Sequence, residues 1–361
     1  MKKTYNNQVI LLGSYPPPYG GVSIHIQRLK EKLDETNIKS IVYDFSPNDI
    51  KNNLPDIIEV NNPIKLLIKF IFIDNKIIIH SHFSNWLLRS IFCLLGLLNK
   101  KTIITIHGES LKKSLEENNW VKKFTIKFAI KKASYIIVMN NDIKQLCLDL
   151  GVIQSRLELI PSFIPPKIQS KEINVISNTI WDFIDDHSPL ISANAFMIKF
   201  HNNKDLYGLD MCIELCKNLV KDYPKIGFIF CLPMIGDERY YLELKKQIIE
   251  NHIENNFLFV NESHQFYPIL MKSDIFVRPT DTDGDAISIR EAIYFKIPVV
   301  TSDCVDRPKT TILFKNRDID DFTRKVKYVL KNFDSCKKEL TELNNIDENF
   351  EKIFNIYSKL S

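Results

Sequence analysis

Short apolar runs alternate with helical patterns along almost the whole chain, and this alternation limits the fold more than any other feature. The apolar run at residues 8–12 precedes a stretch in which Val22, Ile26, Leu29 and Leu33 lie on one helical face. The same order recurs through both halves. Predicted strands cover residues 8–12, 38–43, 76–80, 102–106, 135–139, 157–160, 190–195, 226–231, 257–260, 275–277 and 298–301. Such alternation is typical of parallel βαβ units, so the sequence predicts an α/β protein with doubly wound sheets.

The length of the chain and one break in its pattern predict two domains. A chain of 361 residues suffices for two domains of ordinary size, each with its own core. Between Pro161 and Pro189, prolines and polar residues replace the periodic patterns. We therefore expect a first domain over residues 1–165, a linker over 166–189 and a second domain over 190–345.

Composition excludes several classes of protein. Hydrophobic residues make up 45% and charged residues 25% of the chain, a globular balance, and the net charge of +4 is too small for a dedicated nucleic-acid binder. Seven cysteines without a CxxC pair indicate free thiols in a reducing cytosol. No uninterrupted apolar run reaches the length needed to cross a membrane, so we expect a cytoplasmic protein.

An acidic loop in the second half is the main candidate for a binding site. The predicted strand at 275–277 is followed by a loop with Asp283 and Gly284, and then by a helix that carries Glu291. A helix start offers unpaired N–H groups to phosphates, and carboxylates accept hydrogen bonds from ribose and sugar hydroxyls. The pattern suits a sugar nucleotide. Two carboxylates that merely cap a surface helix remain an alternative.

The first half has weaker candidates at the ends of its strands. Gly20 and Gly21 stand before a predicted helix, where bare N–H groups could meet a phosphate or sugar, although an ordinary turn would look the same. The loop lacks the GxGxxG pattern of nicotinamide enzymes. His107 ends a predicted strand. His80 and His82 form an HxH at an earlier strand end, which provides too few ligands for a metal, so we interpret this pair as structural or as facing an acceptor.

The acidic loop resembles the E-x7-E motif of the family 4 retaining glycosyltransferases, with Asp283 and Glu291 in its two acidic positions. It is especially similar to a subgroup that reads RPT-x-x-DGD-x-x-S-x-REA and belongs to bacterial surface-polysaccharide assembly, and the similarity extends to Arg307-Pro308. The resemblance implies the GT-B fold, two Rossmann-like domains that face each other across a cleft. It also implies that Glu291 binds the donor ribose and Asp283 the transferred sugar. Backbone N–H groups that would face the diphosphate and sugar are those of Ala286, Ile287 and Ser288.

The resemblance also assigns roles to the first half. The Gly20–Gly21 segment is similar to the family's PPxGG loop, and the family's histidine at the position of His107 lies by the donor sugar. The first domain would be the acceptor side, and the second would bind the nucleotide sugar. The closing helix over 346–361 resembles the family's terminal helix, which returns to the first domain.

The family's two basic residues for the leaving diphosphate have no clear match. Counting from Gly208 puts Asn202 and Tyr207 at their positions, whereas counting by charge puts Lys199 and Lys204 there. We prefer Lys204. Either Arg278 or Arg290 could compensate, as a phosphate partner or only as a local ion pair.

The resemblance thus implies a retaining hexosyltransferase that needs neither a metal nor a cofactor. It would move a sugar from a nucleotide diphosphate donor to a saccharide or lipid-linked saccharide acceptor in capsule, O-antigen or exopolysaccharide synthesis. Two alternatives remain: a sugar-nucleotide 2-epimerase with the same donor pocket, and a non-catalytic donor-binding subunit of an assembly complex.

One lysine-rich stretch suggests a partner. Residues 111–135 hold seven lysines interleaved with Trp120, Phe124 and Phe128. A basic amphipathic helix of this kind can lie on anionic lipid, although a solvated surface helix would look similar. The sequence therefore allows contact with the inner face of the cytoplasmic membrane.

Overall fold

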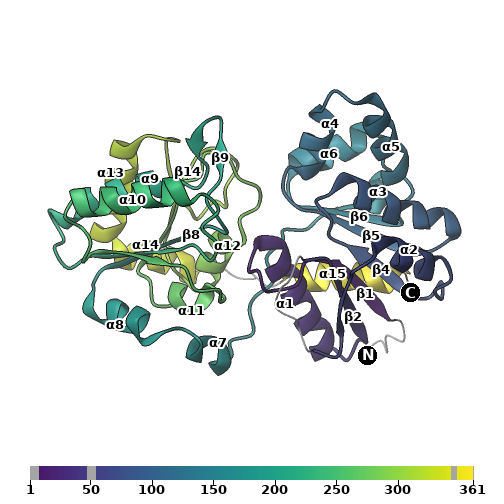
Figure 1. Cartoon of the computed structure of the whole chain (residues 1–361), viewed down its shortest axis with the longest axis horizontal. Helices are drawn as coiled ribbons and strands as arrows, with labels where there is room; N and C mark the ends of the chain where they lie inside the picture. Colours follow the sequence, from purple (N-terminus) through teal and green to yellow (C-terminus); the bar gives the residue numbers. More distant parts are fainter. Residues whose placement is uncertain (1–7, 47–53, 343–347, 361) are drawn as a thin grey trace. The chain divides into compact units, whose positions relative to one another are not determined.

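The computed structural model describes residues 8–46, 54–342 and 348–360. The chain divides into two compact units (Figure 1). Unit 1 comprises Met1–Lys167 together with Asp347–Ser361, and unit 2 comprises Ile168–Ile346.

Unit 1 is built on a seven-stranded parallel sheet in the order β3-β2-β1-β4-β5-β6-β7. The strands are β1 (Val9–Gly13), β2 (Ser40–Asp44), β3 (Ile57–Glu59), β4 (Ile78–Ser81), β5 (Lys101–Ile106), β6 (Tyr135–Val138) and β7 (Leu157–Leu159). β1, β4 and β6 are buried throughout, which explains why they appear in the sequence as continuous apolar runs. The order reverses between β1 and β4, and ligands of such sheets bind beyond the carboxyl ends of the strands at that point.

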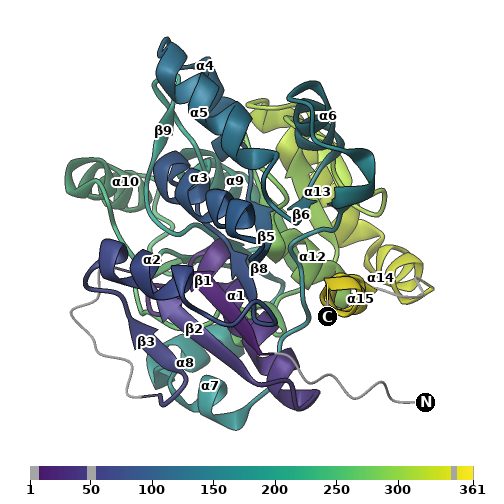
Figure 2. The same cartoon turned by 90° about the vertical axis from the view of Figure 1, so that its right-hand side faces the viewer.

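Helices cover both faces of this sheet. They are α1 (Gly21–Glu35), α2 (Pro63–Ile71), α3 (Trp86–Leu94), α4 (Ser110–Glu116), α5 (Trp120–Ile130), α6 (Asn141–Asp149) and α15 (Glu348–Leu360), with 3-10 turns η1 (Leu95–Leu98) and η2 (Gln154–Arg156). α1 and α15 share one hydrophobic core with the sheet, and α2, α3, α5 and α6 contribute to the cores on the other face. α3 and α5 lie side by side in that second layer (Figure 2).

The C-terminal helix α15 is an integral part of unit 1, where it lies close to α1 (Figure 1). Ile353 and Ile356 are fully buried in the core that α15 shares with α1. The hydroxyl of Tyr357 lies 2.7 Å from Nδ1 of His80 in β4. A segment far away in sequence thus helps to fix the carboxyl end of β4.

Unit 2 has a six-stranded parallel sheet in the order β12-β11-β8-β13-β14-β15. Its strands are β8 (Leu190–Asn194), β11 (Gly227–Cys231), β12 (Phe257–Val260), β13 (Ile275–Arg278), β14 (Val299–Ser302) and β15 (Ile312–Phe314), and β9 (Phe200–His201) with β10 (Lys204–Asp205) forms a separate hairpin. The helices are α7 (Ser170–Asn174), α8 (Asn178–Asp186), α9 (Leu209–Val220), α10 (Glu238–Glu250), α11 (Tyr267–Leu270), α12 (Ile287–Tyr294), α13 (Ile319–Lys331) and α14 (Phe333–Thr341). The order reverses between β8 and β13, so the acidic loop after β13 lies at the switch point.

The linker predicted over 166–189 is wrong for most of its length. From Ile168 onward these residues belong to unit 2 and contain α7 and α8. Ile180 and Ile184, one turn apart on α8, are buried against Leu190 and Ile229 of the sheet. The prolines at the start of the segment led to the prediction of a linker, whereas α8 packs its apolar face against the second sheet.

The lysine-rich stretch 111–135 is two helices and not one. α4 ends at Glu116, and Asn119 caps α5 by accepting a hydrogen bond from the N–H of Lys122 at 3.0 Å. Lys122 is buried and forms an ion pair with Glu117 at 2.6 Å. In the part of the chain that the structure describes, no helix is both long and apolar enough to cross a membrane.

Candidate active site

The acidic loop connects β13 to α12 at the carboxyl edge of the second sheet. α12 begins at Ile287, with Ala286 in its N-cap position. The loop is fastened to its neighbour by the N–H of Asp281, which donates to the carbonyl of Leu206 at 2.9 Å. Gly208 allows this close approach because it has a φ of +69° and a Cβ there would lie 2.4 Å from the carbonyl oxygen of Pro279.

Two arginines converge on the carboxylate of Asp283. Oδ2 of Asp283 accepts hydrogen bonds from Nε of Arg278 at 3.1 Å, from Nη1 of Arg307 at 3.1 Å and from the hydroxyl of Thr280 at 3.3 Å. The N–H of Gly284 donates to Oδ1 at 3.0 Å. The side chains of the three charged residues are at most 12% exposed. Together they carry a net charge of +1 in a largely dehydrated place.

Electrostatics fix the charge states of this cluster. Burial alone would raise the pKa of the Asp283 carboxyl, but the charges and hydrogen bonds of Arg278 and Arg307 outweigh burial and lower this pKa. Burial opposes the charge of Arg278, yet Asp283 raises the pKa of its guanidinium above the ordinary value. Asp283 is therefore an anion at neutral pH, and its charge keeps the two guanidinium groups close together.

Most of the hydrogen-bonding capacity of Asp283 is used inside the cluster. A carboxylate has about four acceptor sites, and three donors already share Oδ2 while Gly284 occupies one site of Oδ1. Oδ1 also accepts a long hydrogen bond from Nη2 of Arg278 at 3.5 Å, which is the contact that a ligand hydroxyl could replace. The main physical effect of Asp283 is thus to hold the two arginines.

Arg278 reaches the loop after β8, where the resemblance leads one to expect a cation. Its Nη1 donates to the carbonyl of Asn194 at 2.8 Å, and its guanidinium lies 5.1 Å from the ring centre of Tyr207. Tyr207 is one of the two positions aligned with the family's basic pair. Lys204, the preferred candidate, is exposed on β10 and is not among the partners of Asp283 in the described contacts.

The remaining predicted residues lie on or before α12. Gly284, Ala286 and Ile287 are partly exposed, whereas Ser288 is buried. Glu291 is 3% exposed and follows Ser288 at a spacing of three, so both lie on the same side of the helix. The helix start is therefore accessible, and Glu291 stands one turn behind it.

Arg290 is engaged locally. Its Nε donates to Oδ1 of Asp285 at 2.5 Å, across the first turn of α12. Of the two arginines that could compensate for the missing basic pair, Arg278 belongs to the buried cluster and Arg290 forms an ion pair at its edge.

In unit 1, the Gly20–Gly21 segment starts α1. The N–H of Gly20 donates to the hydroxyl of Ser23 at 2.9 Å, and a Cβ built on Gly21 would have no atom within 4 Å. The first turn of α1 therefore borders open space at Gly21.

Four histidines gather at the carboxyl ends of β4 and β5. Nδ1 of His82 lies 3.1 Å from Nε2 of His107. Burial, together with neighbouring imidazoles, lowers the pKa of His80, His82 and His107, so these rings are neutral at pH 7. His25 from α1 joins them, with Nδ1 2.6 Å from the carbonyl oxygen of Ser162. The sequence predicted that His80 and His82 provide too few ligands for a metal, but the fold brings His25 and His107 next to His82.

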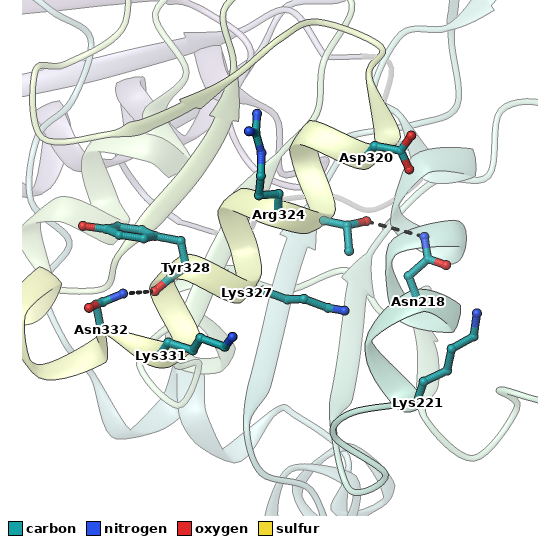
Figure 3. A pocket seen from close by; sticks show the side chains of 9 residues that line it. Asn218, Lys221, Asp320, Arg324, Lys327, Tyr328, Lys331 and Asn332 are labelled. Carbon is teal, nitrogen blue, oxygen red and sulfur yellow. Dashed lines mark hydrogen bonds between the residues drawn. The ribbon is translucent and has the colours of Figure 1, made fainter.

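A separate groove of about 590 Å³ lies on unit 2 between α9 and α13 (Figure 3). Its lining includes Lys221, Arg324, Lys327 and Lys331, and Lys327 forms an ion pair with Asp222. The groove shares no lining residue with the arginine cluster. It is therefore not the donor site that the sequence predicts.

Sequence reasoning gave no role to Arg307 and His25. Arg307 follows β14, the strand next to β13, and belongs to the segment similar to the family motif, so its position beyond an adjacent strand end was an available signal. His25 lies on α1, and nothing in its spacing connects it with His82 or His107.

Comparisons with known proteins agree with this architecture. Residues 188–342 match the family model described as glycosyl transferases group 1. The chain is 23% identical over 316 residues to an uncharacterized glycosyltransferase of Methanocaldococcus jannaschii. The alignment covers 82% of this chain and 78% of that protein. The fold is GT-B. These matches support a nucleotide-sugar glycosyltransferase.

Two solved structures are similar to this chain over nearly its full length. The sucrose-phosphate synthase of Thermosynechococcus elongatus has a TM-score of 0.67 at 15% identity, over 98% of this chain and 99% of that one. Anabaena Alr3699/HepE, in complex with UDP, has a TM-score of 0.66 at 12% identity, over 98% of this chain and 100% of that one.

The cluster generates a prediction about stability. Asp283→Ala should lower the free energy of unfolding by about 3–5 kcal/mol, because it leaves two buried guanidinium groups without their counter-charge. Urea-induced unfolding checks this value. Asp306→Asn, which changes an exposed carboxylate of the Arg307 loop, should stay within about 0.5 kcal/mol of the parent protein. Equal losses of unfolding free energy in the two variants would contradict a stabilising role of the Arg278–Asp283–Arg307 cluster.

Proposed function

We propose that this protein is a retaining glycosyltransferase of family 4 that moves a hexose from a nucleotide diphosphate sugar to a saccharide acceptor. The observation that carries the proposal is the buried Arg278–Asp283–Arg307 cluster beside the start of α12. A leaving diphosphate must have its charge stabilised, and preorganised cations in a dry site do this well. Two guanidinium groups and a helix N-terminus supply that field without requiring a metal.

Each candidate site residue near the start of α12 in unit 2 has a role in this proposal. Arg278 and Arg307 bind the diphosphate, and Asp283 holds them while its Oδ1 accepts from a sugar hydroxyl. Glu291 accepts hydrogen bonds from the ribose. The N–H groups at the start of α12, those of Ala286, Ile287 and Ser288, face phosphate and sugar oxygens. Arg307 thus has the role of diphosphate-binding cation that the sequence analysis assigned to Lys204.

Unit 1 contributes His107 and the Gly20–Gly21 segment. We propose that the imidazole of His107 contacts the transferred sugar, since the ring is neutral and partly exposed at the end of β5. The first turn of α1, next to open space at Gly21, offers N–H groups to an oxygen of the substrate.

The proposed reaction keeps the configuration of the anomeric carbon. The bond from that carbon to the phosphate oxygen breaks as the acceptor hydroxyl oxygen bonds to it on the same face. The hydroxyl proton passes to the departing phosphate oxygen, so atoms and charges balance without an enzymic base. Protein groups position the partners and stabilise the developing charge.

An exposed aromatic ridge on α5 supports a membrane-bound acceptor. Trp120, Phe124 and Phe128 follow one another at a spacing of four, and the first two are 78% and 66% exposed. Lys123 and Lys127 are exposed beside them. Aromatic and basic side chains together bind the interface of anionic membranes. We propose that this ridge brings the enzyme to a lipid-linked saccharide at the inner face of the cytoplasmic membrane, in surface-polysaccharide synthesis.

A second exposed apolar ridge lies in the same helical layer. Ile64, Ile68 and Phe72, on or just after α2, are exposed. α2 and α5 both pack against the sheet face that α3 covers, and we propose that their exposed ridges form one surface of unit 1. This surface gives the proposed membrane contact more apolar area than α5 alone offers.

Donor binding can be tested by thermal shift with a panel of nucleotide diphosphate sugars. A donor at about 100 times its Kd should stabilise the protein by about 2.7 kcal/mol. Glu291→Ala and Arg307→Met should abolish the shift, each measured against the variant's own melting temperature, because they remove the ribose acceptor and a diphosphate cation. Asp306→Asn should keep it.

The best donor then tests transfer. Release of nucleoside diphosphate should require a saccharide or a membrane-lipid extract as acceptor, and the product should retain the donor's anomeric configuration by NMR. Conversion of the nucleotide sugar without acceptor would identify an epimerase instead. Binding with no turnover on any acceptor fraction would identify a donor-binding subunit.

Vesicle flotation tests the membrane contact. The protein should float with vesicles of phosphatidylcholine and phosphatidylglycerol, and Trp120→Glu with Phe124→Glu should weaken this binding at least about tenfold, since apolar area is lost and negative charge is gained. Leu242→Glu alters an exposed apolar side chain on α10 of unit 2 and should bind like the parent. If the α5 variant floats as well as the control, the ridge does not bind membranes.

A further inference from the structure

Three histidine rings in unit 1 form an almost equilateral triangle. The ring centroids of His25 and His82 are 5.2 Å apart, those of His25 and His107 are 5.2 Å apart, and those of His82 and His107 are 5.3 Å apart. One ring nitrogen from each residue lies within 4.8 Å of the other two. The rings come from α1, from the residue after β4 and from the residue after β5. Three separate elements therefore bring one imidazole each to the same place.

The size of the triangle is that of a metal site with three histidines. Zn²⁺ lies about 2.0–2.1 Å from each coordinating nitrogen, hence about 3.2 Å from each ring centre. Tetrahedral angles then separate the centroids by about 5.2 Å and the nitrogens by about 3.3 Å. The observed centroid distances agree with this value, and the 3.1 Å between Nδ1 of His82 and Nε2 of His107 is close to it.

We propose that His25, His82 and His107 bind one Zn²⁺ ion, with the fourth coordination position left to water or another oxygen ligand. Three protein ligands with one open position are the arrangement of zinc sites that accept an exogenous ligand. An ion held by three neutral imidazoles keeps its full charge, which favours hydroxide or an anionic oxygen as the fourth ligand.

The orientation of His25 supports this site. A carbonyl oxygen only accepts, so the 2.6 Å contact requires Nδ1 of His25 to donate to Ser162. With the hydrogen on Nδ1, Nε2 is the nitrogen of His25 that can coordinate a metal. Metal-bound histidines usually donate their other N–H in this way, which fixes both ring orientation and tautomer.

The neighbouring groups leave His82 available as a ligand. Nδ1 of His82 contacts only Nε2 of His107, at 3.1 Å, and a shared metal ion would replace this contact; Nε2 of His82 is buried and has no hydrogen-bond partner among the described residues. The fourth histidine of the group, His80, uses Nδ1 with Tyr357 and Nε2 with Thr105, both at 2.7 Å. His80 therefore supports β4 and is not a ligand.

The test uses the full chain without a histidine tag, stripped of metal by dialysis against a chelator. Titration with Co²⁺ should give the d–d absorption of a four-coordinate site at one ion per chain, and Zn²⁺ should displace it. His25→Gln, His82→Gln and His107→Gln should each weaken Zn²⁺ binding by at least about 100-fold. His252→Asn changes an exposed histidine of unit 2 and should bind like the parent.

Folding is monitored separately, so that a collapsed variant is not mistaken for a lost ligand. The near-UV circular dichroism of each metal-free variant should match the parent, and Zn²⁺ should raise the melting temperature of the parent and of His252→Asn only. Absence of a stoichiometric Co²⁺ spectrum in the parent would overturn the proposal. Unchanged Zn²⁺ affinity in any one of the three ligand variants would overturn it as well.

This inference does not rest on the proposed transferase activity. The ligands belong to unit 1, whereas Glu291, Arg278 and Arg307 belong to unit 2. Donor-induced thermal shifts of Glu291→Ala and Arg307→Met, measured with a chelator, test residues of unit 2 that are no part of the metal site. A failure of metal binding and a failure of donor binding are therefore distinguishable.

Discussion

The interaction on which the candidate donor site depends is the sharing of one carboxylate by two buried guanidinium groups. Burying a charge is costly unless it is paired, and Asp283 pairs with Arg278 and Arg307 at once. Because the three residues together have an excess of one positive charge, the cluster favours the approach of a further anion. The loop that carries Asp283 also ends at the start of α12, where N–H groups point away from the helix. Two independent features therefore favour an anion at one place.

The sheet orders explain why these side chains meet. In unit 2 the order reverses between β8 and β13, so the loops after β8, β13 and β14 converge at one edge. Arg278 ends β13, Arg307 follows β14, and Tyr207 belongs to the loop after β8. Unit 1 repeats the topology, and its reversal between β1 and β4 places His82 and His107 at the equivalent edge. One folding rule thus generates both candidate sites.

Much of this architecture can be predicted from the sequence because strands buried on both faces are short apolar runs. The predicted strand at 102–106 is β5 but for its first residue, and the closing helix predicted over 346–361 contains α15. α8 was missed because its apolar side chains stand among prolines and polar residues typical of a linker. The break between α4 and α5 was missed because the stretch was interpreted as one lysine-rich helix, although no lysine stands between Lys113 and Lys122 and Asn119 caps α5.

The candidate site was predictable only in part. Asp283, Glu291 and the glycines stand in a recognisable local motif. Arg307 and His25 belong to their sites only through contacts with residues at least 24 positions away in the sequence. No spacing rule connects α1 with Ser162 or with the histidines after β4 and β5. Long-range contacts of this kind are set by the packing of the sheets, which periodicity does not specify.

The most direct test of the central claim is a crystal structure of the protein with its nucleoside diphosphate. We predict phosphate oxygens within hydrogen-bond distance of Arg278, Arg307 and the first N–H groups of α12, and ribose hydroxyls within hydrogen-bond distance of Glu291. A diphosphate bound elsewhere, with both arginines contacting only Asp283 and the neighbouring backbone, would contradict it.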